Sequence, residues 1–121
     1  MNIISRKLLK TKNIGLNNKT NRDNWLKNQL LKIPNGENIL DAGAGELQYK
    51  TLCKHLNYIS QDFCKYDGRG DGKGLQTKKW DNSKTDIISD IINIPKQDKY
   101  FDNIMCIEVF EHIPEPIKAL K

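Results

Sequence analysis

The sequence predicts an α/β domain with a mostly parallel sheet. Four segments, 38–42, 57–62, 85–89 and 101–108, are predicted to form strands, and the first of them is a short apolar run. The residues between them leave room for helices or crossovers, and strands that alternate with such connections favour a parallel sheet with right-handed crossovers. At 121 residues, the chain has the size of one small domain.

An amphipathic helix and a turn precede the first strand. Leu26, Leu30 and Ile33 follow the i, i+4, i+7 spacing of one helical face, which predicts a helix near 22–33. Its candidate N-cap residues are Thr20, Asn21 and Asp23. The Pro-Asn-Gly sequence at 34–36 is expected to end this helix and to turn the chain into the first strand.

A second helix is expected between the first two strands. The apolar residues there are separated by polar ones in a helical pattern; they are Leu47, Leu52, Cys53 and Leu56. After the second strand, residues 63–85 hold four glycines from Gly68 to Gly74 and show no sustained period. This segment is therefore expected to form a long loop.

The positive charge lies mainly at the N-terminus. The chain has a net charge of +5, and residues 1–35 hold eight basic residues against Asp23 alone. We therefore expect a basic arm over residues 1–20, followed by a domain over residues 21–121. The arm is interpreted as a solvated lead-in, with RNA or membrane-surface binding as the alternative; a nucleic-acid partner is not expected.

The sequence favours a cytoplasmic protein with free thiols. No apolar run approaches the roughly 20 residues of a membrane-spanning helix, and the N-terminus lacks the apolar core of a signal peptide. The three cysteines, Cys53, Cys64 and Cys106, form no CxxC pair. Their odd number favours free thiols over disulfides or a zinc site.

A glycine turn follows the first strand in the stretch NILDAGAGELQYK, residues 38–50. Ligands of parallel α/β sheets bind at the carboxyl ends of the strands, where this turn is expected to lie. Gly43 and Gly45 lack Cβ atoms, so their backbone can approach a ligand closely. The N-terminus of the following helix would direct free N–H groups toward the same space.

The spacing of the glycines argues against common phosphate and calcium motifs. A dinucleotide fingerprint would need Gly or Ala at the position of Gln48, and it would not expect Asp41 before the turn. The segment around Gly72-Lys73 fails as a P-loop, because Gly74 replaces the Ser or Thr. It also fails as a calcium hand, because Arg69 occupies a ligand position.

Three acidic residues follow the first three strands. Asp41 ends the first strand, Asp62 ends the second and Asp90 follows the third. A carboxylate at the second strand can accept hydrogen bonds from two ribose hydroxyls, and one at the third can accept from an exocyclic amine. Asp41 suits a cationic ligand group. Together the three acids favour a neutral or cationic nucleoside, such as S-adenosylmethionine, although each alone could be a strand-end acid or a helix cap.

Four segments occur in the order and spacing of a known family. The sequences ILDAGAGE, YISQD, ISDIINIP and FDNIMCIEVFEHIPEP resemble the class I S-adenosylmethionine-dependent methyltransferases, and the last resembles the methyltransferase type 11 subgroup. The resemblance covers about residues 23–121. It implies a Rossmann-like parallel sheet flanked by helices, with S-adenosyl-L-methionine as the cofactor. Leu47 departs from the pattern, because many relatives have a third glycine there.

The resemblance also implies roles for individual residues. The glycine turn would line the methionine and ribose part of the cofactor; its residues are Asp41, Ala42, Gly43, Ala44 and Gly45. Asp62 would hold the ribose hydroxyls, and Asp90 with the backbone of Ile91 would hold the adenine. The residues Cys106 to Glu108, including Ile107, would face the methyl group.

The segment 108–112 contains two acids and a histidine. On a helical turn, Glu108, Glu111 and His112 would share one face, as in relatives that bind magnesium or manganese there. In other relatives the same residues only shape the mouth of the active site, and no metal is the favoured interpretation. His112 is the candidate general base for a hydroxyl substrate, because the pKa of histidine suits this task.

The chain is expected to be an N-terminal fragment of such an enzyme. Proteins of this family normally continue with further strands, and the strand near 103–107 would otherwise present an apolar edge open to self-association. The main hypothesis is a methyltransferase for a small-molecule or glycan-like substrate, inactive if truncated. The alternatives are a non-catalytic cofactor-binding remnant or interaction module, and an RNA methyltransferase that uses the basic arm.

Overall fold

The computed structural model describes residues 17–65 and 81–121 of the chain. The chain divides into two compact units, residues 1–33 and 34–121. Most of the expected basic arm and the glycine-rich segment Gly68 to Gly74 lie outside the described residues. Among the described helices, none is long and apolar enough to cross a membrane.

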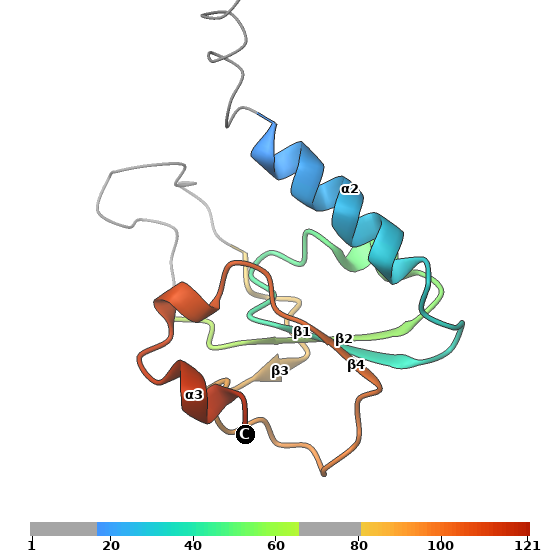
Figure 1. Ribbon diagram of the computed structural model, residues 1–121. Coiled ribbons are helices and arrows are strands. Elements are labelled where there is room, and N and C mark those ends of the chain that lie inside the picture. Colours follow the sequence, from blue (N-terminus) through green and yellow to red (C-terminus); the bar gives the residue numbers. More distant parts are fainter. Residues whose placement is uncertain (1–16, 66–80) are drawn as a thin grey trace, which may run out of the picture. The chain divides into compact units, whose positions relative to one another are not determined.

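The first unit contains the helix α2 (Asn18–Leu30), which confirms the prediction of a helix before the first strand (Figure 1). Leu26 and Leu30 are its buried positions, as the i, i+4 spacing indicated. The expected caps are wrong, because the helix begins earlier than predicted. Asn17 is the N-cap residue, and its carbonyl accepts the N–H of Asn21 at 2.8 Å.

The second unit is built on a parallel sheet of four strands. The strands are β1 (Asn38–Ala42), β2 (Asn57–Asp62), β3 (Ile87–Ile88) and β4 (Asn103–Met105). Their order is β3-β2-β1-β4, and every neighbouring pair is parallel. In the register, Asp41 of β1 lies opposite Ser60 of β2 and Met105 of β4. The predicted parallel sheet is therefore confirmed.

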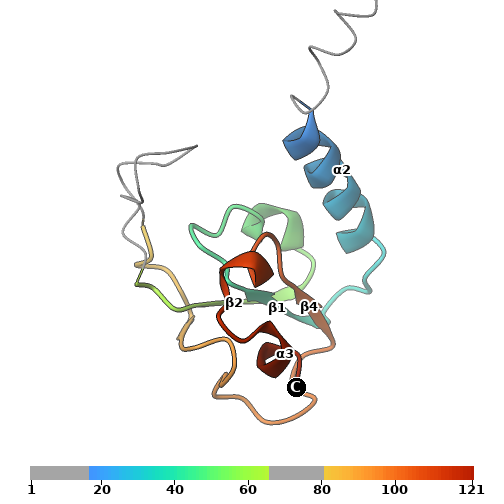
Figure 2. The same cartoon turned by 60° about the vertical axis from the view of Figure 1, so that its left-hand side comes forward.

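Short helical elements flank the sheet. They are the 3-10 helices η1 (Lys50–Cys53) and η2 (Phe110–His112) and the α-helix α3 (Pro116–Ala119). Figures 1 and 2 show η1 and α3 on opposite sides of the sheet. A parallel sheet with flanking helices in this order is a partial Rossmann-like α/β fold.

The core of the second unit lies around the two central strands. Ile39 and Leu40 of β1 point to opposite faces of the sheet, and both are almost fully buried. Strand β1 is thus covered on both faces, as is typical of a parallel sheet. Two polar residues of β2, Ser60 and Gln61, are equally buried, which requires hydrogen-bond partners for their side chains.

The outer strands are shorter than the sequence indicated, because two aspartates interrupt the ladders. The carboxylate of Asp86 accepts the backbone N–H of Ser60 at 2.9 Å, just before β3 begins. The carboxylate of Asp102 accepts the N–H of Asn38 at 2.8 Å, just before β4 begins. These side chains replace the backbone carbonyls that longer strands would have supplied.

The predicted second helix is wrong. Residues 43–49 contain no helix, and between β1 and β2 only the four residues of η1 are helical. Leu47 has a φ of 62°, in the left-handed region, which a right-handed helix cannot accommodate. Leu47, which stands where many relatives have a third glycine, therefore occupies a conformation that favours glycine.

Candidate functional site

The candidate site lies at the carboxyl ends of β1, β2 and β3. Because these strands are parallel, their ends meet at one edge of the sheet. Asp41 is the penultimate residue of β1, Asp62 is the last residue of β2, and Asp90 follows β3. Hydrogen bonds connect the segments that follow the three strands, so they form one structural unit.

The glycine turn is held by β2 and does not form an open cradle of N–H groups. The N–H groups of Gly43 and Ala44 both donate to the carbonyl of Gln61 at 2.9 Å. The N–H of Gly45 donates to a carboxylate oxygen of Asp62, also at 2.9 Å. The expectation of free N–H groups at a helix N-terminus is therefore wrong: no α-helix follows, and these three donors already have partners.

Gly43 is required by a neighbouring side chain as well as by its backbone. Its φ is 73°, and a Cβ atom at this position would lie 2.5 Å from one Cγ atom of Val109 and 2.8 Å from the other. Such distances are too short for carbon atoms. The space that a Cβ atom of residue 43 would occupy is thus filled by Val109, from the segment after β4.

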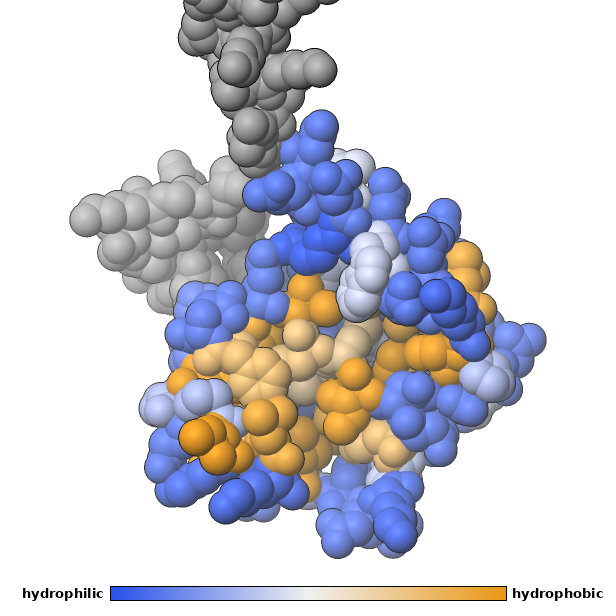
Figure 3. All heavy atoms as spheres, viewed as in Figure 1, coloured by the Kyte–Doolittle hydropathy of each residue, from blue (hydrophilic) through white to orange (hydrophobic). Residues whose placement is uncertain are grey.

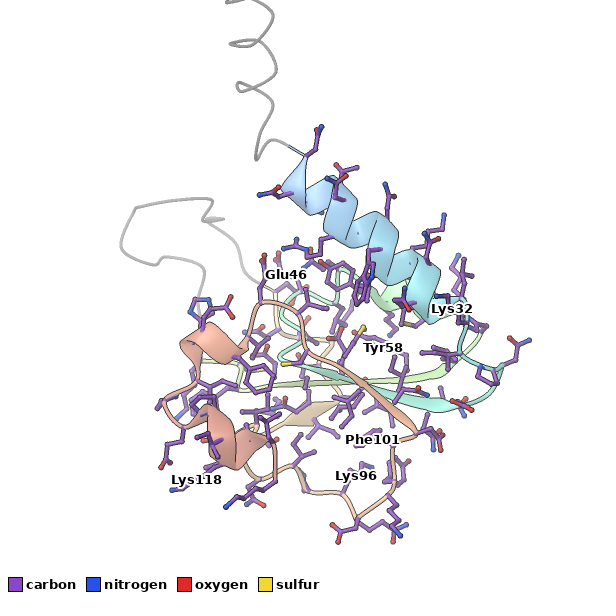
Figure 4. All side chains as sticks on the ribbon, viewed as in Figure 1. Lys32, Glu46, Tyr58, Lys96, Phe101 and Lys118 are labelled. Carbon is purple, nitrogen blue, oxygen red and sulfur yellow. The ribbon has the colours of Figure 1, made fainter. Side chains whose placement is uncertain are left out.

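Asp41 is a buried carboxylate with one hydrogen-bonded partner from β2. Its side chain accepts the hydroxyl of Tyr58 at 2.6 Å, and only 3% of the residue is exposed. Tyr58 lies opposite Ile39 in the register, so it is the diagonal neighbour of Asp41 on the same face of the sheet. Figure 4 shows Tyr58 close to the middle of the sheet. Asp41 caps no helix.

Burial raises the pKa of Asp41 to about 6, because the charged form loses its hydration. The hydrogen bond from Tyr58 lowers this pKa, and the nearby charge of Asp62 raises it. Burial and the charge of Asp41 likewise raise the pKa of Cys53 to about 11. Among residues 17–65 and 81–121, no basic side chain forms an ion pair with Asp41.

Asp62 joins the end of β2 to the glycine turn. One carboxylate oxygen accepts the N–H of Gly45 at 2.9 Å, and the other accepts the N–H of Cys64 at 2.8 Å. Cys64 has a φ of 55°, so the chain leaves β2 through a left-handed residue. Each carboxylate oxygen keeps capacity for a further hydrogen bond, because it has more than one acceptor position.

Gln61 is a central residue of the site that the sequence interpretation did not identify. It is 1% exposed, and its side-chain oxygen accepts the N–H of Gly43 at 3.2 Å. Its side-chain nitrogen donates to the carbonyl and the hydroxyl of Ser89, at 2.7 and 3.3 Å. The available signal was an amide directly before the strand-end Asp62, since an amide inside a buried sheet needs partners.

Asp90 and Ile91 follow β3 in an exposed turn. One carboxylate oxygen of Asp90 accepts the N–H of Ile92 at 3.1 Å, and its carbonyl accepts the N–H of Asn93 at 3.1 Å. This local bonding fixes the backbone of the turn. Asp90 is exposed, so its second oxygen can contact a ligand.

The segment after β4 lies against the glycine turn through Val109. It begins with Cys106, whose pKa is raised by burial and by the charges of Asp41 and Glu111. Ile107 is half-buried, and Glu108 is exposed with a φ of 54°. A left-handed glutamate is strained, and strain of this kind is common at functional sites. Beyond this point, η2 contains the exposed His112.

The structure does not gather the acids and the histidine of this segment into a metal site. Among the described residues, no group of three His, Cys, Asp or Glu side chains could hold a metal ion. Glu108 lies outside η2, which spans only Phe110–His112, so the three residues do not belong to one helical turn. His112 lies 3.8 Å from the carboxylate of Glu111.

One comparison with known proteins agrees with this fold. A family model described as a methyltransferase domain matches residues 18–121. This match spans most of the sequence, and the chain therefore belongs to this methyltransferase domain family. No curated protein and no solved structure gives a significant match to the chain. The predicted resemblance of the chain to the class I methyltransferases is thus confirmed at the level of the family.

Proposed function

We propose that this chain is the S-adenosyl-L-methionine-binding part of a methyltransferase that acts on a small-molecule or glycan-like substrate. One observation carries the proposal: three acids lie at the carboxyl ends of three adjacent parallel strands. The glycine turn after the first of these strands is hydrogen-bonded to Gln61 and Asp62. Membership of a methyltransferase family supports the same conclusion.

Asp41 fits the cationic part of this cofactor. A buried carboxylate without an ion-pair partner among the described residues is destabilised by its own charge, as its raised pKa indicates. A ligand ammonium or sulfonium group nearby would compensate that charge. Ala42 and Ala44, both buried, and the backbone of Gly43 and Gly45 would line the methionine and ribose part.

The nucleoside part would contact the next two strand ends. Asp62 would accept hydrogen bonds from the ribose hydroxyls while keeping its bonds to Gly45 and Cys64. Asp90 would accept the exocyclic amine of adenine, with the backbone of Ile91 beside the ring. Ile107 and the strained Glu108 would lie on the side of the methyl group.

Methyl transfer needs little further chemistry from these residues. The bound cofactor supplies an activated methyl group on its sulfonium, so the protein mainly positions the acceptor and excludes water, effects that can contribute about 7–11 kcal/mol. His112 is exposed and could remove a proton from a hydroxyl acceptor as the reaction proceeds.

Isothermal titration calorimetry tests the proposal. The full chain should bind S-adenosylmethionine and not NAD, and binding should weaken as the pH falls below about 6, where Asp41 becomes protonated. Asp41→Asn should bind at least about tenfold more weakly, the loss expected when a charged contact is removed. Asp98→Asn, an exposed acid away from the site, is the matched control. Binding of NAD alone would overturn the proposal.

A second assay separates an enzyme from a non-catalytic remnant or interaction module. The full chain with methyl-labelled cofactor should transfer the label to a member of a panel of hydroxyl-bearing small molecules. Binding without transfer to any of them would favour the remnant.

Self-association through β4 is a further part of this proposal. Strand β4 lies at one edge of the sheet, and Ile104 in its centre is 66% exposed. Apolar side chains also gather over β4 and α3 on the face seen in Figure 3. An unpaired strand edge of this kind can pair with a second copy of the chain. Light scattering should show a dimer that Ile104→Lys disrupts and that Leu31→Lys, at another exposed apolar position, does not.

A further inference from the structure

We infer that Gln61 is a positioning residue that couples the two halves of the proposed cofactor site. This inference rests on the proposed function and extends it to a residue that contacts neither the methionine nor the adenine part in that proposal. Gln61 lies on β2, between the strand that leads into the glycine turn and the strand that leads into the Asp90 turn.

The side-chain amide of Gln61 bridges these two turns. Its oxygen accepts the N–H of Gly43, and its nitrogen donates to the carbonyl of Ser89 at 2.7 Å. A carbonyl can only accept, so the amide can satisfy both partners in one orientation alone. The rigid amide group therefore holds the glycine turn at a fixed position relative to Ser89, the residue before Asp90.

Burial makes this bridge specific. Gln61 is 1% exposed, so water cannot easily replace either bond, and loss of one partner would leave a buried polar group unsatisfied. The backbone carbonyl of the same residue accepts the N–H groups of Gly43 and Ala44. One residue thus places the turn expected to hold the methionine and ribose at a set position relative to the turn expected to hold the adenine.

The adjacent residue supplies a matched control. Ser60 is also fully buried on β2, but successive residues of a strand point to opposite faces, and its hydroxyl bonds with Asp86 instead. Ser60→Ala removes two hydrogen bonds of this hydroxyl with Asp86 and leaves the bridge intact. A second control, Ser89→Ala, removes only the 3.3 Å contact and keeps the carbonyl acceptor.

The experiment compares Gln61→Met with both controls in the full chain. Gln61→Met keeps the side-chain length and removes the hydrogen bonds of the amide with Gly43 and Ser89, so it should bind S-adenosylmethionine about tenfold more weakly. It should also change the NMR chemical shift of the Gly43 amide, which loses its 3.2 Å contact with the side-chain oxygen and keeps its 2.9 Å bond to the backbone carbonyl of residue 61. Ser60→Ala and Ser89→Ala should bind as the wild type does, even where Ser60→Ala melts at a lower temperature.

The possible results distinguish a failure of the coupling through Gln61 from a failure of the proposed function. If the wild type binds the cofactor and Gln61→Met binds equally well, the coupling is wrong while the proposed function stands. If the wild type does not bind, the proposed function fails, and the chemical shift of the Gly43 amide still reports on the bridge. If Gln61→Met does not fold, the wild type decides: the side-chain amide protons of Gln61 should exchange more slowly when cofactor is added, and an unchanged rate would refute the coupling.

Discussion

The contact between Gly43 and Val109 can be tested by adding one methyl group. Gly43→Ala places a Cβ atom 2.5 and 2.8 Å from the two Cγ atoms of Val109, and it also forces an alanine to a φ of 73°. The left-handed backbone costs about 1–2 kcal/mol, and overpacking adds about 1–3 kcal/mol. Alanine restricts the unfolded chain more than glycine does, and this offsets about 0.4–1 kcal/mol of the loss in stability. We expect a loss of about 2–4 kcal/mol in the free energy of unfolding.

Gly36 separates the two contributions to this loss. Its φ is 85°, but a Cβ atom there would meet nothing within 4 Å. Gly36→Ala should therefore cost only the backbone term, about 1 kcal/mol after the same offset. The difference between the two variants measures the overlap with Val109.

Urea unfolding followed by circular dichroism measures both variants and the double variant Gly43→Ala with Val109→Ala. Removal of both Cγ atoms leaves a contact of 3.2 Å to the Cβ atom of Val109, so the double variant should recover about 1–3 kcal/mol of coupling energy. If Gly43→Ala is no less stable than Gly36→Ala, or if Val109→Ala gives no recovery, the segment after β4 does not lie on the glycine turn.

Three further predictions concern charge and backbone strain. The exposed Lys99 has a φ of 61°, so Lys99→Gly should raise the free energy of unfolding by about 0.5–1 kcal/mol. Lys99→Ala keeps the backbone strain and should not raise it. Equal effects of the two substitutions in urea unfolding would refute this prediction. Because the pKa of Asp41 is raised from 3.8 to about 6, the native state binds more protons than the unfolded chain between these values, and its stability should fall as the pH rises through them. Asp41→Asn should lack this fall and gain up to about 3 kcal/mol at pH 7 in urea unfolding; an unchanged pH profile would contradict it. Tyr58→Phe should raise the pKa of Asp41 further in a carboxyl-carbon NMR titration, and a lower value would show that the hydrogen bond does not favour the charged form.

Local pattern was sufficient for the centre of the sheet. The strands β1 and β2 occupy the predicted residues, 38–42 and 57–62. In β1 the signal was the apolar pair Ile39 and Leu40, because this strand is buried on both faces. At the outer strands, Asp86 and Asp102 shorten the ladders by capturing backbone N–H groups of neighbouring strands, which no local pattern records.

The helix after the glycine turn shows where periodicity fails. Leu47, Leu52, Cys53 and Leu56 have helical spacing, yet only Lys50–Cys53 forms a helix, of the 3-10 type. The backbone at Leu47 is left-handed, and periodicity contains no information about the sign of φ. The departure of Leu47 from the glycine pattern was the one signal of this conformation, because glycine adopts it without strain.

The order and spacing of four sequence segments were enough to identify the methyltransferase family, and the strand-end acids among them led to the candidate site. The partners of those acids depend on register. Tyr58 reaches Asp41 because the parallel pairing of β1 with β2 makes them diagonal neighbours, and Gln61 reaches both Gly43 and Ser89 because β2 lies between β1 and β3. Contacts between residues far apart in sequence arise from strand order and register, which the burial of the whole sheet fixes. Tertiary structure alone therefore decided that Asp41 is buried beside Tyr58, that Val109 fills the space at Gly43 and that Gln61 joins the two turns.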